Sequence, residues 1–172
     1  MLIARARYIV SSMSARDHIA RLYPEMRAYA TTLARDRTEA EDLAGDAVVR
    51  ALSHDRAPAD PERLRPWLLR TIRNLHIDKW RAGRVRREYR ETVGRISYES
   101  RAAAVEDDVL GRMALARLTP EHREVLILVD GLGHSYAEAA ALIGVPRGTV
   151  MSRLARARAA MVAQVRGAQE GQ

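Results

Sequence analysis

The sequence predicts an all-α protein made of two small helical domains joined by a flexible linker. Three observations predict this fold class. Apolar residues recur at steps of three and four over most of the chain, which is the spacing of one face of a helix. No segment alternates apolar and polar residues as a half-buried strand does. A polar stretch with weak apolar periodicity then separates two periodic segments.

The pattern places the boundaries of these parts along the chain. We predict an N-terminal extension over 1–14, a first domain over 15–84, a linker over 85–105, a second domain over 106–166 and a tail over 167–172. Met13 is a second possible start of translation, so the residues before it are expected to be a loose extension.

Composition limits the function classes. The 172 residues include 29 basic and 22 acidic side chains, for a net charge of +7, and Lys79 is the only lysine. An excess of arginine favours a polyanionic partner. The absence of cysteine excludes disulfides and thiolate metal sites within the chain. No apolar run approaches the roughly 20 residues of a membrane span, and Arg5 and Arg7 interrupt the first residues, so we expect a cytoplasmic protein without membrane insertion.

Two amphipathic helices are predicted in the first domain before residue 53. The stripe of the first includes Ile19, Met26 and Leu33, and that of the second runs from Ala40 to Leu52. The segment 36–46, around the start of the second helix, holds five acids and one arginine. A surface with this charge suits a protein partner rather than DNA.

A loop and a basic helix complete the first domain. Pro58 and Pro61 indicate a loop over 53–66, and a third helix should start near Pro66, because proline suits the first helical turn. Residues 63–90 hold ten basic and two acidic side chains. Several arginines fall within about 80 degrees of one another at the helical step of about 100 degrees per residue. A basic helix is usually solvated surface, but arginines with neighbouring amides and aromatics also suit opened, single-stranded DNA.

The second domain reads as a helix-turn-helix. Thr119 is a suitable N-cap, followed by Pro120 in the first turn, and this helix should stop at the glycines of 131–133. Ala140 and Gly144 then have the spacing of a helix-turn-helix, which needs a small residue for close packing and a turn residue free to adopt positive φ. In the helix that follows, Val150 and Leu154 are the expected inward anchors. The exposed side would fit the major groove and contact bases and phosphates; its expected DNA-contacting residues are Arg147, Thr149, Met151, Ser152, Arg153 and Arg156.

Enzyme chemistry finds no support in the sequence. The five histidines show neither metal-ligand nor triad spacing, and the glycines form no phosphate-binding loop. We therefore expect no catalytic residue, no metal and no cofactor.

A resemblance to a known family is carried by three segments: RTEAEDLAGDAVVRAL, RPWLLRTIRNLHIDKWR and LTPEHREVLILVDGLGHSYAEAAALIGVPRGTVMSRLARAR. Together they resemble the bacterial extracytoplasmic-function (ECF, group IV) sigma factors of the sigma-70 family. The resemblance implies a two-domain protein, with region 2 and region 4, that binds RNA polymerase core and directs promoter-specific initiation. Its partners would be the beta-prime clamp helices, the beta flap, promoter DNA and an anti-sigma factor.

The resemblance also implies roles for individual residues. Residues 147–158 would read the minus-35 element. The residues expected to contact and help melt the minus-10 element are Arg65, Arg70, Arg73, Asn74, Asp78 and Arg81. The residues expected to bind polymerase are Glu39, Glu41, Asp42 and Asp46.

The chain departs from the family pattern at Met151, where many relatives have a basic residue, and at Ala155, where many have a larger ring. The target sequence therefore cannot be borrowed from a relative. A free-standing helix-turn-helix regulator is the alternative, and it would bind duplex DNA tightly without polymerase. A sigma-like decoy for an anti-sigma factor is a third possibility, but such proteins normally carry a receiver domain, for which 172 residues leave no space.

Overall fold

The computed structural model describes residues 2–53, 57–91 and 114–170, which are helices, turns and short connections. None of the residues in these ranges forms a strand, and the all-α prediction is confirmed. The predicted linker from residue 92 onward, and residues 106–113 at the start of the predicted second domain, lie outside the described residues.

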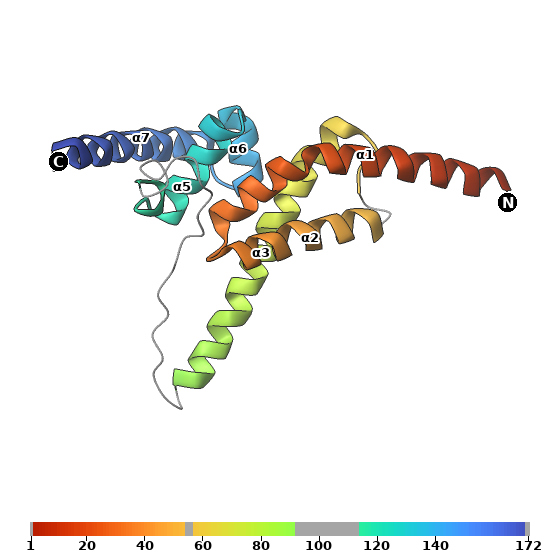
Figure 1. Ribbon diagram of the computed structural model, residues 1–172, viewed down its shortest axis with the longest axis horizontal. Coiled ribbons are helices and arrows are strands. Elements are labelled where there is room, and N and C mark those ends of the chain that lie inside the picture. Colours follow the sequence, from red (N-terminus) through yellow and green to blue (C-terminus); the bar gives the residue numbers. More distant parts are fainter. Residues whose placement is uncertain (1, 54–56, 92–113, 171–172) are drawn as a thin grey trace.

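Two groups of helices follow one another along the chain (Figure 1). The first group holds α1 (Leu2–Leu33), α2 (Arg37–Ser53) and α3 (Pro61–Glu91), and the second holds α5 (Pro120–Leu126), the π-helix η1 (Ile127–Gly131), α6 (Tyr136–Ile143) and α7 (Arg147–Glu170). Helix α1 therefore includes residues that the sequence assigned to an N-terminal extension, and α3 continues into the start of the predicted linker.

The first group packs around the apolar faces that the sequence predicted. Helix α1 contributes Ile19 and Met26, α2 contributes its small residues and Leu43, and α3 contributes Leu68 and Ile72, all buried. Small side chains such as Ala44 and Ala47 on α2 let the helices approach closely. The helices are thus held by burial of one stripe each, as expected for amphipathic helices.

Helix α3 starts earlier than the sequence predicted. Pro66 lies inside the helix, and Pro61 occupies its first turn. The physical reason is the side chain of Asp60. Its carboxylate accepts a hydrogen bond from the Glu62 N–H at 3.0 Å and so caps a helix that begins at Pro61. Both prolines suit a first turn, and only the earlier one is preceded by this cap.

The helix signals of the second group are confirmed in position and in mechanism. The Thr119 side chain accepts a hydrogen bond from the His122 N–H, with Pro120 in the first turn of α5. The chain leaves η1 at the predicted glycines, where Gly133 has a φ of 71°. Helix α6 begins with a complete capping box, in which Ser135 and Glu138 each bind the other's backbone N–H.

The helix-turn-helix prediction also holds. Gly144 ends α6 in the left-handed conformation, with φ of 73° and ψ of 38°, and its N–H donates to the Ala140 carbonyl. Val150 and Leu154 of α7 are buried, as predicted for its inward anchors. Together they fix how α7 is rotated, and hence which of its side chains face outward.

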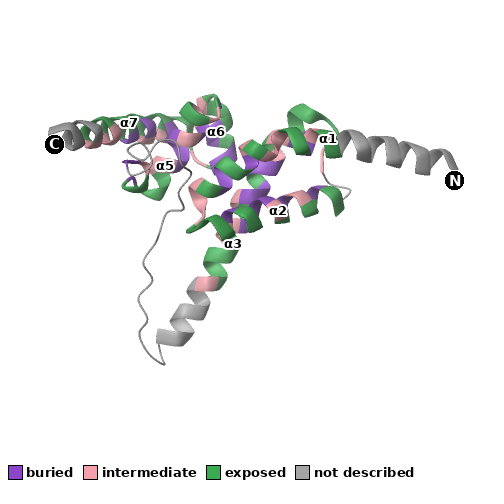
Figure 2. Ribbon diagram, viewed as in Figure 1, coloured by how far each residue is buried: buried purple, intermediate pink, exposed green. Residues whose placement is uncertain are grey.

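The two groups of helices pack directly against each other. Helix α3 contacts α6, and α1 contacts both α5 and η1. Buried apolar residues of both groups belong to one continuous cluster, and Figure 2 shows buried positions facing the junction from either side. The arrangement of the two domains is therefore closed, a feature that no sequence pattern indicated.

Candidate nucleic-acid interface

The outward face of α7 carries most of the residues predicted for duplex DNA. Four of these six residues are exposed, namely Arg147, Met151, Ser152 and Arg156. The other two, Thr149 and Arg153, are half-exposed. The helix starts at Arg147 and has no acid in its first turn, an arrangement that favours phosphate oxygens. This face can therefore lie in a major groove with its cations at the edges.

Arg158, although on the same helix, is engaged within the domain. Its guanidinium donates to both carboxylate oxygens of Asp130 in η1, at 2.9 and 2.6 Å. These hydrogen bonds and the charge of Asp130 raise the pKa of Arg158 above its usual value. The bidentate pair joins α7 to η1 and so orients α7, rather than offering a free cation to DNA.

The residues predicted for opened DNA divide into two sets on α3. Arg70, Asn74, Asp78 and Arg81 are exposed. They lie on one side of the helix, because their spacings of three, four and seven or eight residues bring them round to the same face. Even here, the Arg70 guanidinium donates to the Ala141 carbonyl of α6 at 2.5 Å. One exposed cation of this set thus already touches the other domain.

Arg73 belongs to a buried polar cluster between the domains. Its Nε donates to Glu124 Oε1 at 2.9 Å, and the Tyr29 hydroxyl donates to the same oxygen at 2.7 Å. Tyr29 has 0% of its surface exposed. Burial, together with the neighbouring carboxylate, raises the pKa of Tyr29 well above its usual value, so the hydroxyl keeps its proton and remains a donor.

Arg65 forms a second cross-domain cluster. Its guanidinium contacts a Glu25 carboxylate oxygen at 2.8 Å and donates to the Leu132 carbonyl at 2.8 Å. The buried His134 ring lies 3.8 Å from the same carboxylate. Burial raises the pKa of Glu25, but the adjacent His134 and Arg65 lower it further, so the net shift is downward. In the closed arrangement, Arg65 and Arg73 are occupied by partners other than DNA.

The four acidic side chains predicted to bind polymerase lie on α2 and differ in whether a partner protein could reach them. Glu39 is turned back on the helix start, where it accepts hydrogen bonds from the backbone and side chain of Arg35. Burial raises its pKa, yet these contacts lower it overall. Glu41 pairs with Arg37, and Asp46 lies 3.3 Å from Lys79 of α3. These last acids, together with Asp42, are exposed.

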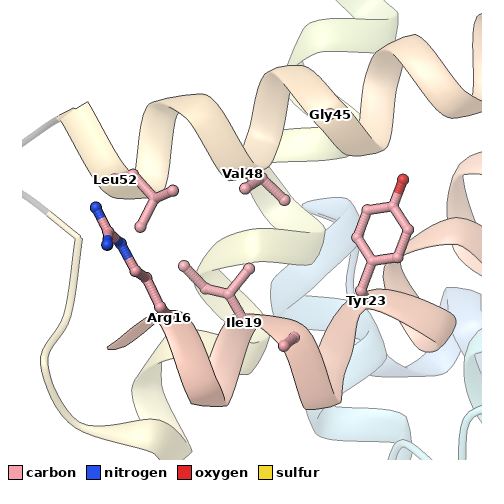
Figure 3. Close-up of a pocket in the computed structure, with 7 residues that line it drawn as sticks. Arg16, Ile19, Tyr23, Gly45, Val48 and Leu52 are labelled. Carbon is pink, nitrogen blue, oxygen red and sulfur yellow. The ribbon is translucent and has the colours of Figure 1, made fainter. Parts of the chain in front are cut away.

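An apolar cleft of about 320 Å³ lies beside this acidic face, between α1 and α2. Figure 3 shows Ile19 of α1 pointing toward Val48 and Leu52 of α2, with Tyr23 at one end and Arg16 at the other. Leu52 is 40% exposed. The lining is apolar apart from Arg16 and the Tyr23 hydroxyl, and an exposed apolar surface of this kind suits a protein rather than DNA.

Sequence reasoning missed Glu124, the residue that joins the two domains. A signal was present, because Glu124 stands four residues before the buried Leu128 and next to the buried Val125, on the apolar side of its helix. A charged residue on an apolar face needs a buried partner. The sequence could not say that the partners would be Tyr29 and Arg73.

Comparison with known proteins agrees with the two halves of this structure. Residues 18–86 match the family model described as Sigma-70 region 2, and residues 112–161 match that described as Sigma-70, region 4. The chain is 35% identical over 155 residues to the ECF RNA polymerase sigma factor EcfG of Rhodopseudomonas palustris, covering 87% of this chain and 84% of that protein. The chain belongs to the ECF sigma factors of the sigma-70 family.

Further relatives of this sigma factor are similar in sequence and in fold. The ECF RNA polymerase sigma factor SigC of Mycobacterium tuberculosis is 38% identical over 133 residues, covering 74% of this chain and 71% of that protein. The sigma factor RpoE of Bartonella quintana, solved in complex with the anti-sigma factor NepR, has a TM-score of 0.69 and 27% identity, covering 88% of this chain and 96% of that one.

These matches decide between the functions considered from the sequence. The chain is a sigma factor that binds RNA polymerase core and directs promoter-specific initiation, rather than a free-standing regulator. Within the described residues, no helix is both long and apolar enough to cross a membrane. Nor do the described ranges contain a group of three or more histidine, aspartate or glutamate side chains placed to hold a metal ion.

Proposed function

We propose that this sigma factor, a member of group IV, reads the minus-35 element with α7 of its region 4. The observation that carries the proposal is the helix-turn-helix itself, in which Gly144 sets the turn and Val150 with Leu154 turns the opposite face of α7 outward. Arg147 and Arg156 are exposed on that helix. The described residues form no ion pair with either of these two arginines, so both can reach DNA.

The minus-10 element is assigned to α3 of region 2. Asn74, Asp78, Arg70 and Arg81 present amide, carboxylate and cationic groups on one exposed face. Such groups can hydrogen-bond a base that has left the duplex and can hold the strand on either side of it. Arg65 and Arg73 would join them only when the two domains separate, because both are engaged across the domain junction. Separation would also release Arg70 from the Ala141 carbonyl of α6.

Polymerase binding is assigned to the exposed acids of α2, namely Glu41, Asp42 and Asp46, together with the neighbouring apolar cleft. The beta-prime clamp helices are the proposed partner of this face, and the beta flap that of region 4. Glu39 would contribute by capping α2 rather than by direct contact, since Arg35 occupies its carboxylate. An anti-sigma factor is a further proposed partner, as RpoE of Bartonella quintana was solved with one. The protein would act in the cytoplasm, with catalysis left to polymerase.

Run-off transcription tests the proposal. Purified core polymerase is incubated with and without the protein on a library of genomic promoter fragments, and specific transcripts should appear only with the protein. Arg156→Ala should then weaken upstream-element binding by roughly 1 to 3 kcal/mol if the side chain contacts a base. Arg117→Ala, an exposed arginine of the same domain outside α7, is the matched control.

A second pair of variants separates recruitment from strand opening. Asn74→Ala should lower the yield of open complex, detected by permanganate reactivity of unpaired thymines, more than it lowers promoter recruitment. Arg50→Ala, an exposed position of α2 in the same domain, is the control and should change neither. Equal open-complex yield from Asn74→Ala and wild type would remove Asn74 from the site, and a complete lack of specific transcripts would refute the proposed function.

A further inference from the structure

The exposed side of the reading helix α7 carries a large apolar side chain at its edge. Met151 is 48% exposed in the second turn of α7. Gly148 and Ala155, three residues before and four after it, are exposed as well and carry no long side chain. A Cβ built on Gly148 would meet nothing within 4 Å. No long side chain at these two positions therefore covers the exposed part of Met151.

The rotation of α7 makes this exposure a fixed property. Val150 and Leu154 are buried to 0% and 2%, and Ala157 continues the same buried stripe. Steps of about 100 degrees per residue place Met151 about 100 degrees from Val150 and about 60 degrees from Leu154, at the border between the buried stripe and the exposed face. Asp130 strengthens the orientation by holding Arg158 from η1. Met151 cannot turn inward unless this whole helix rotates.

The chemistry of the side chain limits what it can recognise. A thioether has no hydrogen to donate and carries no charge, so it adds little to the binding of a phosphate or of a polar base edge. It is flexible and polarisable, and it packs well against methyl groups. The apolar feature of the major groove is the C5-methyl group of thymine.

We propose that Met151 determines specificity by packing against the methyl group of one thymine in the minus-35 element. The inference rests on the proposed function, since it requires α7 to lie in that major groove. Arg147 and Arg156 flank Met151 on the exposed surface and would bind phosphates or neighbouring bases, so the methyl contact would be enclosed by polar ones. A lysine or arginine at position 151 would bind a phosphate or a guanine, whereas Met151 would favour a thymine.

Removal of single thymine methyl groups from the promoter DNA tests the proposal directly. Holoenzyme is formed from core polymerase and the full chain, and each thymine of the upstream element is replaced in turn by deoxyuridine, which lacks only the methyl group. Wild-type holoenzyme should lose about fourfold in promoter binding at one thymine position, the value expected for one buried methyl-sized group. Met151→Ala should lose a similar factor on the thymine promoter and should be insensitive to deoxyuridine at that position.

Val162→Ala is the matched control, because Val162 is also apolar and is 51% exposed on the same helix, three turns later. This variant should keep the full sensitivity to deoxyuridine. The inference is overturned if no thymine position is sensitive, or if Met151→Ala retains the wild-type sensitivity. In either case, promoter-specific transcription by the wild-type protein would still support the proposed function. Absence of any specific transcript would overturn both together.

Discussion

Removal of the Tyr29 hydroxyl should loosen the closed arrangement of the two domains. The hydroxyl donates to Glu124 at 2.7 Å across the junction, and Arg73 binds the same oxygen. Tyr29→Phe keeps the buried ring and leaves the carboxylate with one donor fewer. A buried hydrogen bond to a charged group contributes about 1.5 to 3 kcal/mol. At about 1.4 kcal/mol per factor of ten, the ratio of closed to open molecules should fall by roughly 10- to 150-fold.

The assay uses the absence of cysteine in this chain. Cysteines introduced at the exposed positions Thr38 and Ala163 would place one dye on each domain. Energy transfer between the dyes is then followed in increasing urea. The urea concentration at which transfer is lost should fall for Tyr29→Phe. Since this midpoint reports free energy, it responds even when open molecules are rare in water.

Two comparisons show whether the effect acts through Glu124. Tyr23→Phe removes the same group from the same helix, where Tyr23 lines the cleft between α1 and α2, and should leave the midpoint unchanged. In a Glu124→Leu background, Tyr29→Phe should have no further effect, because the acceptor is gone. An unchanged midpoint for Tyr29→Phe, or an equal loss in both backgrounds, would refute the reasoning.

Three further predictions concern stability. The pKa of Glu25 is lowered in the folded protein, so its carboxylate stabilises the fold above the ordinary pKa of about 4.5, and this stabilisation is lost as the pH falls below that value. Glu25→Gln should therefore reduce the fall in melting temperature between neutral and acidic pH. An equal fall in the variant and the wild type would contradict the assignment. Ser135→Ala breaks the capping box of α6 and should cost about 1 kcal/mol in chemical unfolding, with Ser53→Ala, exposed at the end of α2, as the control. Gly144→Ala places a side chain at a positive φ and should lower the free energy of unfolding by about 1 to 2 kcal/mol. Gly148→Ala adds a methyl group to a helical position with open space around it and should raise that free energy by about 0.5 to 1 kcal/mol. Equal effects of the two substitutions would refute the backbone argument.

Helix positions were largely predictable because the signals that set them are local. Thr119, Ser135 and Gly144 each act within a few residues of their own position, through a cap or a turn. The error at the start of α3 has the same local origin. Two prolines offered equivalent first-turn signals, and the side chain of Asp60 selected the earlier one. The outward face of α7 was also predictable, since the buried stripe through Val150 and Leu154 fixes it.

By itself, the sequence determined the all-helical class, the helix-turn-helix and the two charged surfaces, because periodicity and capping act over short separations. Only the tertiary structure decided which arginines of α3 remain open to DNA. Arg73 and Asn74 are neighbours in sequence, yet Arg73 meets Glu124 from 51 positions away while Asn74 is exposed. A helical period tells which residues share a face, but the partner of that face is set by how separate helices pack.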